Sequence, residues 1–272
     1  MRNKWSCSLV LVMFFSSCAS RRGEDFSPNQ IPIHFLPCTD APLVKVNIEG
    51  KECLLKLDLG ATCDLMLKQS VLDQINVTTV IGWSSAIDIR GHHYQKPQFE
   101  ISNIKMGPIS IDHAVVIEED LFFTPQSNQL SGRIGNSIFR STACYFDLSH
   151  SKFYIGANVE EIREKHSLQN FVKIPLDTQN GLLNVDLMTT DGIKKFVFDT
   201  GSNVSVLDKS KVPQKSEKTT TQLELGQFGL WNFHLLDFPE NWPTVDGILG
   251  MDFFMKHIIC FDFQNQFVYL SK

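Results

Sequence analysis

Two aspartates stand at the ends of mostly apolar stretches, and each is followed by one residue and then a glycine. Asp58 ends the stretch 54–57, and Asp199 ends the stretch 195–198. A buried carboxylate is costly unless something uses it, because burial penalises its charged form. Two carboxylates held close together cannot both ionise, so they share a proton. The ionised one would then take a proton from water while the protonated one donates to a carbonyl oxygen. This chemistry is general acid–base hydrolysis of an amide, without a covalent intermediate.

An internal duplication places one of these aspartates in each half of the chain. Residues 132–155 align without a gap with residues 247–270. The identical pairs are Gly132/Gly247, Gly135/Gly250, Phe139/Phe254, Phe146/Phe261, Asp147/Asp262 and Tyr154/Tyr269. Each copy follows its own Asp-x-Gly segment, so the duplication predicts two lobes related by pseudo-two-fold symmetry.

The two halves differ between the Asp-x-Gly segment and the repeated segment. The first half has a long insertion from 77 to 117, in which 86–90 and 98–101 alternate like strands around the turn-like residues 91–94. This pattern predicts a projecting hairpin. The second half has only a polar stretch, 208–222, before its next apolar residues, and lacks room for an equal hairpin.

These motifs together resemble the aspartic peptidases, specifically the retropepsin-like and pepsin-like group. The sequence Asp199-Thr200-Gly201-Ser202 matches the family's Asp-Thr-Gly-Ser/Ala motif in full, and Asp58-Leu59-Gly60-Ala61 matches it except at the second position. The resemblance covers about residues 40–272. It implies an all-β fold of two pseudo-symmetric, acid-protease-like barrel lobes with a cleft between them.

The resemblance also implies roles for individual residues, with Asp58 and Asp199 as the catalytic pair of an endopeptidase. The remaining assignments are the active-site loop residues Gly60, Ala61, Thr200, Gly201 and Ser202 and the support-loop glycines Gly135 and Gly250. Tyr94 is a candidate for the tip of a flap that closes over substrate, the alternative being an ordinary exposed turn residue. The implied substrate is an extended peptide or protein. No metal and no organic cofactor is implied, and we expect a monomer because one chain supplies both lobes.

Three departures from the family pattern all fall in the first half. Leu59 replaces a threonine whose hydroxyl would bond across the lobes, and Arg133 replaces an apolar residue of the support loop. Lys56 lies two residues before Asp58 on a strand, hence on the same face, where an ammonium would lower the pKa of Asp58. Two interpretations therefore stay open: an active endopeptidase, or an inactive protease-like protein that binds peptides.

The N-terminus has the features of an export signal. Arg2 and Lys4 precede an apolar run at 9–15, which is shorter than a transmembrane helix requires. The residues up to Cys18 resemble a bacterial lipobox. We therefore expect a signal peptide at 1–17, lipidation of Cys18 and an exported lipoprotein of the cell envelope, held to the membrane by its lipid. The alternative is an ordinary cleaved signal peptide.

The bulk composition and these boundaries complete the expected organisation. The chain of 272 residues carries a net charge of −5, which disfavours nucleic acid as a partner. The predicted segments are a lipidated tether at 18–39, a first lobe at 40–156, a linker at 157–171 and a second lobe at 172–272. Five cysteines lie beyond Cys18, and their spacing fixes no disulfide pairing.

Overall fold

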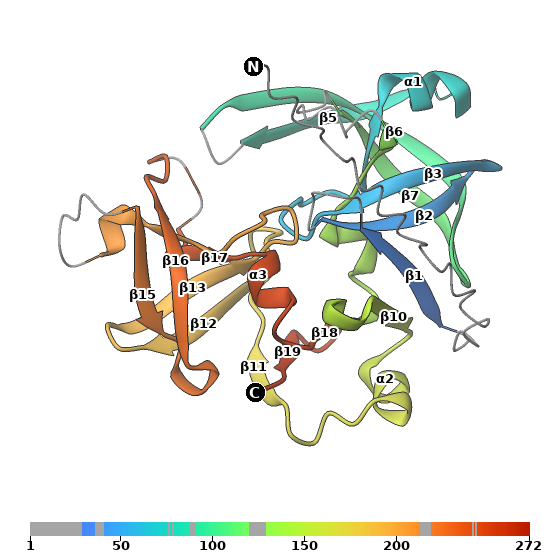
Figure 1. The fold of residues 1–272 in the computed structure, drawn as a ribbon. Helices are drawn as coiled ribbons and strands as arrows, with labels where there is room; N and C mark the ends of the chain where they lie inside the picture. The colour runs from blue at the N-terminus through green and yellow to red at the C-terminus, as the bar shows by residue number, and fades with distance from the viewer. Residues whose placement is uncertain are drawn as a thin grey trace, which may run out of the picture.

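The computed structural model describes residues 29–272 apart from 36–40, 76, 78, 88–90, 120–128, 213–218, 241 and 243. The described residues form two lobes of β-sheet joined by a shared sheet (Figure 1). The expected all-β class is confirmed. Helices are short: α1 (Gln69–Leu72), α2 (Val159–Lys165) and α3 (Met251–Phe254). Single 3-10 turns add η1 (Asp73–Ile75), η3 (Asn136–Phe139), η4 (Leu148–His150), η5 (Lys209–Lys211) and η6 (Gly226–Phe228).

Lobe one is a barrel. Its strands are β2 (Pro42–Ile48), β3 (Lys51–Leu57), β4 (Leu65–Lys68), β5 (Val80–Ile87), β6 (His93–Met106), β7 (Ile109–Glu119) and β8 (Gly132–Ile134). They lie in the order β2-β3-β8-β4-β7-β6-β5, and an additional pairing of β2 with β6 closes the sheet on itself. Strand β3 buries every second residue, Cys53, Leu55 and Leu57, because alternate side chains of a strand point to the same face.

Lobe two is a half-barrel. Its strands are β12 (Asn184–Thr189), β13 (Gly192–Phe198), β14 (Val206–Asp208), β15 (Thr220–Glu224), β16 (Leu230–Leu236) and β17 (Gly247–Leu249). The described strands keep the order β12-β13-β17-β14-β16-β15 without a closing pair. The expected pair of pseudo-symmetric lobes is confirmed, and lobe two is the less closed of the two because its insertion supplies only the short hairpin β15–β16, as its shorter sequence predicted.

The shared sheet connects the lobes and contains the pseudo-two-fold axis. Its strands are β1 (Gln30–Phe35), β9 (Ala143–Asp147), β10 (Lys152–Gly156), β11 (Val172–Pro175), β18 (Ile259–Asp262) and β19 (Phe267–Leu270). At its centre β9 pairs antiparallel with β18, and Tyr145 lies opposite Cys260. These two residues occupy equivalent positions of the duplicated segments, as do Phe146 and Phe261, whose ring centroids are 5.8 Å apart. The duplication seen in the sequence is thus a symmetric pairing in space.

The structure adds detail to two segments of the expected organisation. Strand β1 lies within the stretch 18–39 that was predicted as a tether, because the buried Ile31 and Ile33 alternate with the exposed Pro32 and His34. The linker stretch contains the helix α2, whose N-terminus is capped by the Asn158 side chain. Among the described residues, no helix is long and apolar enough to cross a membrane.

The projecting hairpin of lobe one is present. Strands β5 and β6 pair antiparallel from Val80–Phe99 to Ile87–His93, and the hairpin extends away from the body of lobe one (Figure 1). Trp83 is 67% exposed on it. The backbone of Tyr94 lies in β6 opposite Ala86, close to the tip, but its side chain is outside the described part of the chain.

Candidate functional site

The two Asp-x-Gly segments form the same tight loop in both lobes. The Asp58 N–H donates to Ile134 O at 2.8 Å, and the Asp199 N–H donates to Leu249 O at 3.0 Å. Each aspartate carbonyl then accepts from the residue three positions later, Ala61 at 3.1 Å and Ser202 at 3.2 Å. The loops therefore have matching backbone geometry, although their side chains differ.

The support loops, which contain Gly135 and Gly250, form hydrogen bonds to these turns. Asn136 N–H donates to Ala61 O at 2.9 Å, and the equivalent Met251 N–H donates to Ser202 O at 2.8 Å. Gly135 and Gly250 each precede one of these donors, and neither position has room for a side chain. A Cβ atom added to Gly135 would lie 2.1 Å from the carbonyl oxygen of Cys63, and one added to Gly250 would lie 2.5 Å from the Val204 carbonyl group.

The two carboxylates face each other across the lobe boundary. A Cβ atom added to Gly60 would lie 2.5 Å from the Asp199 carboxylate, and one added to Gly201 would lie 2.4 Å from Oδ1 of Asp58. Each glycine thus lets its loop approach the carboxylate of the other lobe. The structure brings together all the residues predicted for the active-site loops.

One side chain ties the two loops to each other. The hydroxyl of Thr200 is fully buried, donates to Leu57 O at 2.8 Å and accepts from the Leu59 N–H at 3.0 Å. Leu59 offers no hydroxyl in return and is instead fully buried in the hydrophobic core. The substitution of leucine therefore removes one half of a reciprocal arrangement and leaves the other half intact.

An ion-pair network occupies the lobe-one side of the site. The guanidinium of Arg133 donates from Nη1 to Oδ2 of Asp58 at 3.0 Å, and its Nε lies 2.5 Å from Oε1 of Glu119. Glu119 ends β7 and its side chain is 1% exposed. Neither of its carboxylate oxygens makes a well-formed hydrogen bond, so the Arg133 charge is its main compensation. No local pattern in the sequence pointed to Glu119, because the pairing of β7 with β4 that brings it here joins residues far apart in the chain.

Lys56 reaches across the lobe boundary. Its ammonium donates to Gly201 O at 2.9 Å, which places it beside both aspartates in a partly buried position. In the Asp199 loop of lobe two, the Gly201 N–H donates a hydrogen bond to Oδ1 of Asp199 at 2.6 Å. Among the described hydrogen bonds, none joins Gly60 to Asp58 in the same way. The Ser202 hydroxyl donates to Val204 O at 2.7 Å, and not to a carboxylate.

These contacts give the two carboxyl groups opposite pKa shifts. Burial pushes the pKa of Asp58 upward, but the Lys56 ammonium and the Arg133 guanidinium outweigh it and hold the pKa below its usual value. Burial and the neighbouring Asp58 charge raise the pKa of Asp199 to about 7. Burial likewise raises the pKa of Glu119, against the opposing charge of Arg133. Near neutral pH the pair therefore holds one charge on Asp58 and a proton on much of Asp199.

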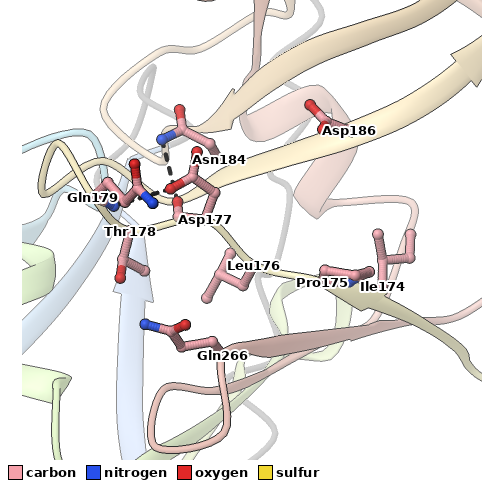
Figure 2. A pocket seen from close by; sticks show the side chains of 9 residues that line it. All are labelled: Ile174, Pro175, Leu176, Asp177, Thr178, Gln179, Asn184, Asp186 and Gln266. Atoms are coloured by element: carbon pink, nitrogen blue, oxygen red, sulfur yellow. Dashed lines mark hydrogen bonds between the residues drawn. The ribbon is translucent and has the colours of Figure 1, made fainter.

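Two open cavities lie at the base of the lobe junction, away from the aspartate pair. One of about 320 Å³ runs along residues 174–179, with Asn184, Asp186 and Gln266 on its other sides (Figure 2). The other, of about 420 Å³, adjoins it and is lined by Arg140 and Phe263 among others. Asn136 also lines the second cavity, and its side-chain amide donates to both Leu59 O and Gly181 O, which connects the loop of lobe one to lobe two. Neither cavity is lined by Asp58 or Asp199.

Two β lobes with one Asp-x-Gly loop each, joined by a sheet on the pseudo-two-fold axis, define the pepsin-like aspartic protease fold. The chain is similar in structure to basic 7S globulin from soybean, with a TM-score of 0.58 and 10% sequence identity over 89% of this chain and 94% of that chain. It is also similar to conglutin gamma, a basic 7S globulin from lupine seeds, with a TM-score of 0.57 and 11% identity over 90% and 95% of the two chains. Both are described as globulins and neither as a peptidase.

At these identities the likeness shows the fold alone. No protein-family model matches the sequence, and no curated protein matches it either.

Proposed function

We propose that this protein binds an extended segment of polypeptide between its two lobes without hydrolysing it. The observation that carries this proposal is the ion pair between Arg133 and Asp58. An extended segment suits a site between two β lobes, because main-chain groups of a strand-like peptide can bond to the exposed loops and to the β5–β6 hairpin.

The ion pair works against hydrolysis at the step that needs a base. Attack by water requires Asp58 to accept a proton, and a general base must be within hydrogen-bond reach of that proton. Oδ1 of Asp58 points toward Gly201, while Oδ2 is held by the guanidinium. Two cations, Arg133 and Lys56, further lower the proton affinity of this carboxylate. Asp58 is therefore a weaker base, and one of its oxygens already accepts a hydrogen bond. Both features favour peptide binding over hydrolysis.

A second candidate function, aspartic endopeptidase, is favoured by the opposed titration of the two carboxyl groups. One ionised and one protonated carboxyl group is the state that acid–base hydrolysis requires. The raised pKa of Asp199, at about 7, would keep that state populated up to neutral pH. The main-chain loops and the Thr200 tie are also in place.

One experiment separates the two functions. The purified protein and its Asp58→Ala and Asp199→Ala variants are incubated with a library of unstructured peptides at pH 4 to 7.5. Binding is measured by peptide pull-down with mass spectrometry, and cleavage is measured by new peptide termini. We expect wild type to retain peptides and to release no more new termini than the two variants. Cleavage by wild type that both substitutions abolish would establish the endopeptidase instead.

We further propose that the protein acts as a monomer in the cell envelope, anchored to the membrane through a lipid on Cys18. The support for this is the signal-like N-terminus, which lies outside the described residues. Metabolic labelling with a radioactive fatty acid should mark the wild-type protein and not a Cys18→Ser variant. Equal labelling of the two would contradict the anchor.

A further inference from the structure

The charged residues around Asp58 occupy positions that are apolar in lobe two. In the parallel pairing of β3 with β8, Lys56 lies opposite Arg133, and in the equivalent pairing of β13 with β17, Val197 lies opposite Ile248. The same correspondence holds one strand further. Glu119 lies opposite Lys68 at the end of the β4–β7 pair, and Leu236 lies opposite Asp208 at the end of the β14–β16 pair. Lobe two therefore carries apolar side chains at the positions of Lys56, Arg133 and Glu119, although Leu236 is 40% exposed where Glu119 is buried.

We infer that the site retains a latent peptide-hydrolysing activity, and that Arg133, held in place by Glu119, is the positioning residue that suppresses it. The inference rests on the proposed function, since it explains why the molecule would bind peptide without cleaving it. It goes further because it attributes the absence of hydrolysis to the contact between Arg133 and Asp58. The other groups that hydrolysis needs are present in both lobes.

Glu119 is the reason that Arg133 cannot simply turn away from Asp58. The carboxylate of Glu119 is almost fully buried and depends on the guanidinium for compensation. Moving Arg133 into solvent would leave that carboxylate without a partner, and an uncompensated buried charge is strongly unfavourable. Arg133 is itself only 25% exposed along its side chain. The network is therefore a fixed part of the fold rather than a surface contact.

Once the guanidinium is removed, the groups left in place balance the reaction with water as the co-reactant. The water oxygen bonds to the peptide carbonyl carbon as Asp58 takes a proton from the water, and the carbonyl oxygen takes the proton of Asp199. The resulting diol breaks its C–N bond as Asp58 returns its proton to the nitrogen. A diol hydroxyl then returns a proton to Asp199, which leaves a carboxylic acid and an amine.

The test transfers the side chains of lobe two into lobe one, in the full-length protein. The double variant Arg133→Ile/Glu119→Leu takes the residues that Ile248 and Leu236 provide in the equivalent positions. Replacing a buried ion pair with apolar residues of similar volume is often neutral or stabilising, so the variant should fold. We expect it to cleave the peptide library at least about a hundredfold faster than wild type, the size of a typical acid–base contribution. Adding Asp58→Ala or Asp199→Ala to it should abolish the gain.

A matched control is Arg140→Ile, because Arg140 is an exposed arginine of the same lobe whose guanidinium donates to Ser137 and contacts neither aspartate. This control should cleave the peptide library no faster than wild type does. If the double variant does not fold, Arg133→Gln/Glu119→Gln keeps the polar volume and carries the same expectation.

The outcomes distinguish this inference from the function on which it rests. A folded double variant that still binds peptide but shows no aspartate-dependent cleavage, beside a silent wild type, overturns the inference and leaves the binding function standing. Aspartate-dependent cleavage by wild type itself overturns the binding function, and with it the need for a suppressing residue. Cleavage by the double variant that survives Asp199→Ala also overturns the inference, since the activity would lie elsewhere.

Discussion

The Asp58 loop of lobe one and the Asp199 loop of lobe two have the same backbone but different electrostatic surroundings. Asp199 follows a strand whose Val197 packs with Leu182 and Val245, and its carboxylate accepts a bond from the Gly201 N–H. Asp58 instead accepts from Arg133 and lies beside Lys56. Duplicated backbone geometry therefore does not ensure duplicated chemistry. Side chains on the neighbouring strands decide which carboxyl group keeps its proton.

The largest effect that distinguishes the lobes should come from the central pair, Arg133 and Ile248. Arg133→Met leaves two buried carboxylates without their shared cation, which should lower the free energy of unfolding at pH 7 by about 3–5 kcal/mol. Ile248→Met is a volume-conserving apolar change and should cost less than about 1.5 kcal/mol. Urea unfolding monitored by circular dichroism measures both. Equal costs would mean that the ion pair contributes nothing specific to lobe one.

The pH dependence of stability should have opposite signs for the two aspartates. The pKa of Asp199 is raised from 3.8 to about 7 on folding, so its contribution to stability is full below about pH 4 and is lost as the pH rises to 7. Asp199→Asn should remove that slope, which amounts to a few kcal/mol. The pKa of Asp58 is lowered, so Asp58 contributes stability above its unfolded pKa that is lost in acid. Between pH 4 and 7, Asp199→Asn should remove the fall in stability, and Asp58→Asn should reduce it only in part, because the Asp58 charge is one cause of the raised Asp199 pKa. Below pH 4, only Asp58→Asn should remove the loss of stability in acid. Equal changes in both variants over the whole range from pH 3 to 8 would contradict the opposite pKa shifts.

The cross-lobe tie should depend on the lobe-two residue more than on the lobe-one residue. Thr200→Val keeps the shape but leaves Leu57 O and the Leu59 N–H without a buried partner, which should cost about 2 kcal/mol. Leu59→Val removes one methylene from the core and should cost about 1 kcal/mol. Thermal unfolding at a fixed pH compares them. A larger loss for Leu59→Val would place the importance of this contact in packing rather than in the hydroxyl.

The smallest effect concerns Lys56, whose lobe-two equivalent is Val197. Lys56→Val removes one hydrogen bond to Gly201 O and should cost about 1 kcal/mol. Because the Lys56 charge lowers the pKa of both aspartates, both pKa values should rise in the variant. Carboxyl carbon chemical shifts followed by NMR against pH measure this change. Lys45→Val is the control, because Lys45 is an exposed lysine of the same lobe that pairs with Glu52. An unchanged pKa at Asp58 in Lys56→Val would mean that Arg133 alone holds its charge.

The internal duplication, together with the resemblance to the aspartic peptidases, predicted the two-lobe fold and both Asp-x-Gly loops. The gap-free alignment of 132–155 with 247–270 predicted two pseudo-symmetric lobes, and the structure adds that the duplicated strands β9 and β18 pair with each other. The residue types predicted a close approach of backbone to carboxylate at Gly60 and Gly201, and the resemblance assigned Gly135 and Gly250 to the support loops. The structure shows that none of these four positions has room for a side chain. The alternation of residues in β5 and β6 predicted the hairpin, because a period of two residues is typical of a strand.

Only the tertiary structure decided what surrounds the carboxylates. The sequence flagged Lys56 and Arg133 as unusual, but not that Lys56 bonds Gly201 O across the lobes or that Arg133 bridges Asp58 and Glu119. These contacts join residues far apart in the chain, and their energies depend on burial and on separations of a few ångströms. The sequence by itself determined that two aspartates would meet. Their unequal protonation came from the three-dimensional placement of neighbouring charges, which no local pattern encodes.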